Sequence, residues 1–214
     1  MTAEQLIEEG RKLQRPCFFL RPEVSGEVAA IWHECDDEEI EETGFQCWLT
    51  VDARFIPNLP KSITGFISIF SNEDDCETGK IEISAKKPDR DGVKLYAHAA
   101  AVIPPLDAVF SKPSEVVDEW LKANGCSSYE RDCFNFNKNE ITKAYQKIWF
   151  KEFPLYSNSD VYAVLGGWHW PGPDHDWHDL IDEHLMVLTM RNSEPWIEAW
   201  RMKNGEFKVI QRIT

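Results

Sequence analysis

The chain has 214 residues, 43% of them hydrophobic, which is enough apolar material for a folded core and excludes wholesale disorder. Its 37 Asp and Glu residues outnumber the 23 Lys and Arg residues and give a formal net charge of -14. A field this negative opposes nucleic-acid phosphates and anionic membrane surfaces, so we predict neither as a partner and expect a basic protein instead.

The N-terminal residues 1–14 have neither the basic start nor the apolar run of a signal peptide. Thr2 and Gln5 have the spacing of a capping box, and apolar residues recur at helical intervals, which predicts an amphipathic helix. Residues 15–22 form an apolar stretch between two prolines, where we expect a packed connector. No segment approaches the roughly 18 consecutive apolar residues of a membrane helix, so we expect a cytoplasmic protein with reduced cysteines and no cofactor.

The next part of the chain alternates between strand-like segments and polar turns. The acidic run of residues 34–42 has seven acids in nine residues. We expect a solvated loop there, and the alternative is a surface that recognises a basic partner. The segments that predict an antiparallel β-meander are 26–33, 44–54, 63–70, 81–85 and 93–103.

Two helices and a second group of strands are expected in the rest of the chain. The helices are predicted at 111–125 and 137–150, and Asn204-Gly205 is the strongest hairpin signal. The fold class is therefore α+β, with an N-terminal helix, an antiparallel β-meander, two central helices and a C-terminal four-strand region that ends in the Asn-Gly hairpin. We expect one domain over 1–214, with possible sub-parts 1–105 and 106–214, and leave open whether these share one core. The C-terminal strands are predicted at 161–167, 184–190, 195–202 and 206–213.

Residues 166–184 are the one dense group of chemically active side chains. They hold four of the six histidines, five carboxylates and three of the nine tryptophans. If 174–183 is helical, one of its faces carries histidines and carboxylates, a donor set that suits a metal ion. A short helix that buries its apolar side leaves the same histidines and carboxylates in water without any metal, and we favour this interpretation. The residues of the metal alternative are His175, His178, Asp179 and Asp182.

The tryptophans of this segment are candidate binding residues. Exposed, they would form a stacking platform or the centre of a protein interface; buried, they would be a core cluster, which we favour. No serine-hydrolase, phosphate-loop or dinucleotide-binding motif is present, and His33 beside Cys35 forms no specific pattern. The candidate binding residues are Trp168, His169, Trp170 and Trp177.

These observations favour a non-enzymatic, acidic protein-binding module that engages a basic partner. Immunity and inhibitor proteins use such an electrostatic plan, although the analogy is one of composition. The alternatives are a metal-dependent or carbohydrate-active enzyme with its site in 166–184, and a DNA mimic. Three segments, 34–42, 73–77 and 174–183, supply 16 of the 37 acids and contain no Lys or Arg.

Overall fold

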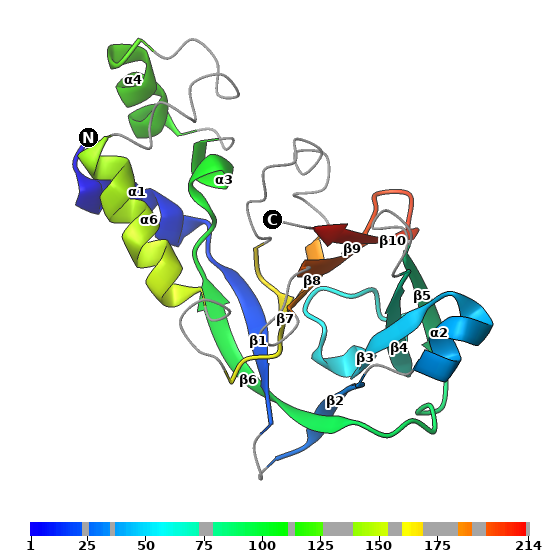
Figure 1. Cartoon of the computed structure of the whole chain (residues 1–214). Coiled ribbons are helices and arrows are strands. Elements are labelled where there is room, and N and C mark those ends of the chain that lie inside the picture. Colours follow the sequence, from blue (N-terminus) through cyan, green and yellow to red (C-terminus); the bar gives the residue numbers. More distant parts are fainter. Residues whose placement is uncertain are drawn as a thin grey trace.

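The computed structural model describes residues 1–22, 26–34, 37–72, 79–110, 114–125, 139–153, 160–168, 184–189 and 196–212. Figure 1 shows one rolled sheet, with α1, α3, α4 and α6 gathered at one end and α2 at the other. The helices are α1 (Ala3–Lys12), α2 (Asp37–Thr43), α3 (Leu106–Phe110), α4 (Glu115–Ala123), α6 (Glu140–Glu152) and the 3-10 turn η1 (Ala53–Phe55).

Every strand pair described in the sheet is antiparallel. The order across the ten-stranded sheet is β10-β9-β8-β7-β1-β6-β2-β3-β4-β5. The prediction of an α+β protein built on an antiparallel sheet is confirmed. The strands are β1 (Arg15–Arg21), β2 (Val28–Trp32), β3 (Gln46–Asp52), β4 (Phe66–Ser71), β5 (Gly79–Ser84), β6 (Val93–Val102), β7 (Ala163–Gly166), β8 (His184–Thr189), β9 (Trp196–Arg201) and β10 (Phe207–Arg212).

Strand β1 joins the two β-rich parts of the chain, because it pairs with β6 on one side and with β7 on the other. The expectation of a connector at 15–22 is therefore wrong. Pro16 indicates a connector in the sequence, but it lies one residue before 17–20, the residues of β1 that pair with β7. The N–H that a proline lacks costs little at that position. Pro22 lies just beyond the end of the strand.

The acidic run is also different from the expected loop, since 37–43 form helix α2. Glutamate is a good helix former, and acids in the first turn interact favourably with the helix dipole. Gly44 ends the helix with a φ of 72°, and its N–H donates to the carbonyl of Ile40 at 2.8 Å. The sequence signal for this helix is a first turn rich in acids together with Gly44 just after the last turn.

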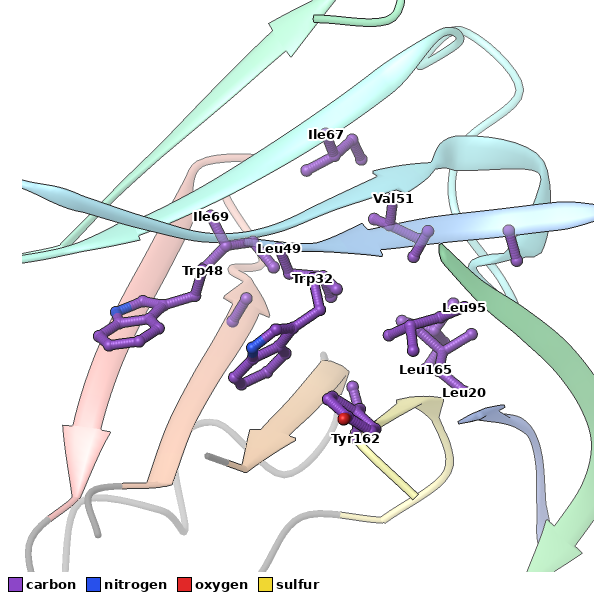
Figure 2. Packing of buried hydrophobic residues seen from close by; sticks show 14 of the residues in the cluster. Leu20, Trp32, Trp48, Leu49, Val51, Ile67, Ile69, Leu95, Tyr162 and Leu165 are labelled. Carbon is purple, nitrogen blue, oxygen red and sulfur yellow. The ribbon is translucent and has the colours of Figure 1, made fainter. Parts of the chain in front are cut away.

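The inner face of the rolled sheet holds the main hydrophobic cluster (Figure 2). Alternation along the strands places apolar side chains on this face, as with Leu49 and Val51 of β3. The cluster draws on both β-rich parts, because Leu165 and Ile197 belong to it as well. Trp32, Trp48 and Tyr162 form an aromatic group in it, with ring centroids 6.2 Å apart for the two tryptophans and 5.4 Å apart for Trp32 and Tyr162.

The two ends of the sheet meet where β5 lies against β10. Gly79 of β5 approaches Val209 of β10 so closely that a Cβ at position 79 would overlap the Cβ and Cγ1 of Val209. Non-bonded carbon atoms do not come that close, so the contact requires glycine. The approach of these two strands completes the roll of the sheet.

The outer face is covered at one end by the helices. Tyr145 and Trp149 of α6 pack with Leu6 of α1 and Trp120 of α4 in a second hydrophobic cluster. The hydroxyl of Tyr145 donates to the carbonyl of Pro104 at 2.8 Å, which ties this layer to the end of β6. Within the described residues, no helix has the length and apolarity needed to cross a membrane.

The contact of β5 with β10 is tested by Gly79→Ala, which we expect to lower the free energy of unfolding by about 1–3 kcal/mol because the added Cβ overpacks the contact. Urea unfolding measures this change. In a Val209→Gly background the side-chain atoms that the added Cβ would meet are gone, and the cost of Gly79→Ala should fall. An equal cost in both backgrounds would show that the two strands do not meet at these residues.

Candidate functional site

Helix α2 presents a face of carboxylates to solvent. Glu38, Glu41 and Glu42 are exposed, whereas Glu39 and Ile40 are half-buried. The spacing explains this division, because residues three and four positions apart lie on the same side of a helix. We call the exposed face formed by Glu38, Glu41 and Glu42 the acidic face.

Glu39 points the other way and forms a two-point ion pair with Arg90, from the loop before β6. Arg90 Nη1 donates to Glu39 Oε2 at 2.6 Å, and Nη2 donates to Oε1 at 2.5 Å. The Glu39 side chain is only 13% exposed, and this carboxylate raises the pKa of Arg90. A planar guanidinium that holds both oxygens of a carboxylate fixes orientation as well as distance, so the pair positions α2 on the sheet.

Aromatic rings and a second cation lie beside this pair. Lys80 Nζ lies 4.9 Å from the ring centroid of Phe45 and 4.6 Å from that of Phe70, and forms an ion pair with Glu82 at 2.9 Å. The guanidinium carbon of Arg90 lies 5.7 Å from the same Phe70 ring. Both cations are therefore held by a carboxylate and by the face of an aromatic ring.

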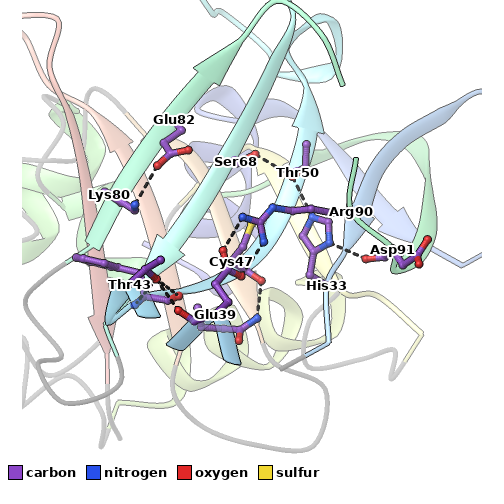
Figure 3. A network of polar contacts seen from close by, with 12 residues as sticks. His33, Glu39, Thr43, Cys47, Thr50, Ser68, Lys80, Glu82, Arg90 and Asp91 are labelled. Carbon is purple, nitrogen blue, oxygen red and sulfur yellow. Dashed lines mark hydrogen bonds and ion pairs between the residues drawn. The ribbon is translucent and has the colours of Figure 1, made fainter. Parts of the chain in front are cut away.

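A chain of hydrogen bonds leads from the carbonyl of Asp91, the residue after Arg90, into the sheet (Figure 3). His33 Nδ1 lies 2.8 Å from the carbonyl oxygen of Asp91, and its Nε2 lies 2.9 Å from Thr50 Oγ1. A carbonyl only accepts, so Nδ1 carries the proton, and Nε2 of the neutral ring accepts from the Thr50 hydroxyl. Thr50 Oγ1 is 2.9 Å from Ser68 Oγ, and because Thr50 donates to His33, Ser68 donates to Thr50.

The strand pattern explains why these polar groups lie on the outer face of the sheet. Thr50 alternates with Leu49 and Val51, whose side chains belong to the inner cluster, so its hydroxyl lies on the outer face. Ser68 alternates in the same way with its apolar neighbours in β4, and it is the direct cross-strand partner of Thr50. We call His33, Thr50, Ser68, Arg90, Glu39 and the Asp91 carbonyl the polar network.

The polar network is better suited to holding structure than to nucleophilic chemistry. Thr50 and Ser68 are 2% and 4% exposed, so neither hydroxyl can reach a substrate from solvent. Burial raises the pKa of the nearby Cys47 thiol to about 12, which keeps it in the unreactive thiol form. Burial is also the largest influence on His33, whose pKa is lowered.

Of the candidate binding residues, the structure places Trp168, which is 2% exposed. Its Nε1 donates to the carbonyl of Leu13 at 2.9 Å, and the guanidinium carbon of Arg15 lies 3.6 Å from its ring centroid. Trp168 therefore lies in the interior, which agrees for this one residue with the core cluster that we favour. His169, Trp170 and Trp177 lie outside the described residues, and a role for them in binding stays a prediction.

The metal alternative falls on a part of the chain that is not described. Its residues, His175, His178, Asp179 and Asp182, lie between 168 and 184. Within the described ranges, no three His, Cys, Asp or Glu side chains gather in a group that could hold a metal ion. A metal-dependent or carbohydrate-active site in 166–184 stays a prediction, which elemental analysis of the purified protein tests.

Sequence reasoning passed over the residues that the structure brings together. In the sequence His33 stands near Cys35, and no local pattern links it to Thr50, Ser68 or Arg90, which are distant in sequence. The one available signal was the acidic run, for which a recognition surface was the alternative to a solvated loop.

Comparisons of the chain with protein-family models, with curated proteins and with solved structures find no match. The class of protein is therefore inferred from the residues of this chain alone. Two features stand out in the part of the chain that the structure describes. They are the acidic face of α2 and the polar network, whose Glu39–Arg90 pair attaches α2 to the sheet.

The role of Arg90 is tested by Arg90→Lys, which keeps the charge but loses the two-point contact. We expect faster hydrogen exchange of the α2 amides, with a local loss of about 0.5–1 kcal/mol because the pair is partly exposed to solvent. Arg54→Lys is the matched control, since Arg54 makes a similar two-point contact with Asp52 at the end of β3. Unchanged exchange of α2 in Arg90→Lys would contradict the positioning role of the pair.

Proposed function

We propose that this protein is a non-enzymatic module that binds a basic protein partner through the acidic face of α2, in the manner of immunity and inhibitor proteins. One observation carries the proposal: three exposed carboxylates share one face of a helix that a two-point ion pair holds on the sheet. The acids at 73–77 and 174–183 lie outside the described residues and carry no part of it.

The physical basis is electrostatic complementarity. A net charge of -14 speeds the approach of a positively charged protein, and like-charge repulsion disfavours acidic partners and nucleic acids. A helix fixed in position before binding loses less conformational entropy when the partner arrives. The attraction is screened by salt, because the carboxylates of the acidic face are exposed.

We further propose that this binding takes place in the cytoplasm. Cys17 and Cys47, the cysteines that the structure describes, are both buried free thiols. Free thiols are the usual state in a reducing compartment, which supports this location.

The function is tested by removing the three charges of the acidic face with Glu38→Gln, Glu41→Gln and Glu42→Gln together. Exposed charge pairs contribute about 0.5 kcal/mol each, so three give roughly a tenfold loss of affinity. Pull-down from cell lysate at about 50 mM and about 300 mM salt, with the captured proteins identified by mass spectrometry, provides the partner. Titration of that partner against each variant measures the loss.

Helix α4 offers a matched control, because Glu115, Asp118 and Glu119 are three exposed acids on another helix. Their replacement by Gln, Asn and Gln removes the same charge and should leave affinity within about twofold of the wild type. Equal losses in the two triple variants would mean that only net charge matters. Capture of no basic protein, or binding that ignores salt, would contradict the proposed function.

A further inference from the structure

Helix α6 has a basic outer face, although the protein as a whole is acidic. Lys147 and Lys151 are exposed and lie one turn apart, and Phe150 beside them is 44% exposed. Tyr145 and Trp149 lie on the other side of the helix, in the second hydrophobic cluster. We call the exposed surface formed by Lys147, Phe150 and Lys151 the basic face.

The charges of the basic face are available to a partner. Lys143, one turn earlier in α6, forms an ion pair with Glu140 at 2.7 Å. Within the part of the chain that the structure describes, Lys147 and Lys151 form no ion pair. Two lysines beside an exposed aromatic ring suit a partner surface that offers carboxylates together with an apolar side chain.

Helix α4 offers these groups in the mirror order. Glu115 and Glu119 are exposed, and Val116 between them is 41% exposed. Along α6 a lysine is followed by the apolar residue three positions later and by the second lysine immediately after it; α4 shows the same spacing of glutamates and valine when it is followed backwards. Antiparallel packing of the two helices therefore matches all three positions at once. The pairs are Lys147 with Glu119, Phe150 with Val116, and Lys151 with Glu115.

These two surfaces do not meet within one molecule. Trp120 of α4 and Trp149 of α6 both lie in the second hydrophobic cluster, so each helix turns its other side, the exposed one, away from that cluster. Val116 and Phe150 are also two of the three large hydrophobic side chains that the described residues leave exposed. The matching contact therefore requires two copies of the chain.

We propose that this protein self-associates by packing α4 of one copy antiparallel against α6 of a second copy. The contact covers one exposed apolar side chain of each helix and joins two lysines to two glutamates. Exposed ion pairs are weak, so the association is reversible. The proposal does not depend on the function proposed above, because it uses neither α2 nor the acidic face.

The charges next to the contact, rather than the net charge of -14, govern the approach of two copies. At physiological salt, charges more than about 8 Å apart are largely screened, and α2 lies at the other end of the sheet from α4 and α6 (Figure 1). An anionic membrane or a nucleic acid fits the basic face less well. Its extended charge would also meet the exposed acids of α4 at the same end of the molecule.

Sedimentation equilibrium of the full chain, at concentrations up to about 1 mM, tests the inference. We expect reversible self-association of the wild type. Lys147→Glu with Lys151→Glu should weaken it roughly tenfold, because two attractive pairs become repulsive. Glu115→Lys with Glu119→Lys should weaken it equally, for the same reason. A wild type that stays monomeric throughout this range would overturn the inference and leave the basic face to a different acidic partner.

An equimolar mixture of the two charge-reversed proteins gives the sharpest result. Each contact between one protein and the other again joins opposite charges, so the mixture should associate as the wild type does. No recovery in a mixture of two proteins with wild-type circular dichroism would overturn the inference.

Lys86→Glu with Lys94→Glu is the matched control for net charge, since both lysines are exposed and lie outside the helices. It should leave the association constant within about twofold of the wild type. If a charge-reversed protein fails to fold, Lys147→Gln with Lys151→Gln takes its place and should still weaken association more than the control does. Equal weakening by the control would overturn the inference.

Discussion

The described strands form one ten-stranded sheet, and both of its faces must be shielded from water. The roll of the sheet shields the inner face. The close approach of Gly79 and Val209 brings β5 against β10, so the inner face becomes a hydrophobic interior that the sheet itself encloses. The outer face needs other cover. Helices α1, α3, α4 and α6 supply it at one end, whereas α2 lies at the other end, where Glu39 pairs with Arg90 of the loop before β6.

The chemistry of α2 follows from that position. A seven-residue helix with five acids has little apolar surface to bury, so packing alone would hold it weakly. The ion pair between Glu39 and Arg90 supplies the attachment, and the ring of Phe70 and the His33 hydrogen bonds support the arginine side of the pair. The carboxylates of the acidic face stay exposed to solvent or to a partner. The attachment of α2 thus depends on the inward-facing Glu39, and the proposed function depends on the outward-facing carboxylates of the acidic face.

Alternation along β3, β4 and β6 was visible in the sequence, because one face of each strand is buried and periodicity reports burial. Strand β1 was missed because Pro16 and Pro22 resemble boundaries, although both lie where β7 does not pair. Helix α2 was missed because charge density suggested a loop. The polar network could not be predicted, since His33, Thr50, Ser68 and Arg90 come from four separate places in the chain and the register of β2, β3 and β4 brings the first three together.

The central claim is that the acidic face of α2 is the binding surface of this protein. It is tested most directly by following every backbone amide by NMR while poly-L-lysine is added. The account predicts that the largest changes fall in residues 37–43, with smaller ones in the loop that carries Arg90. Largest changes in α1, α4 or α6, which also carry exposed acids, would contradict it.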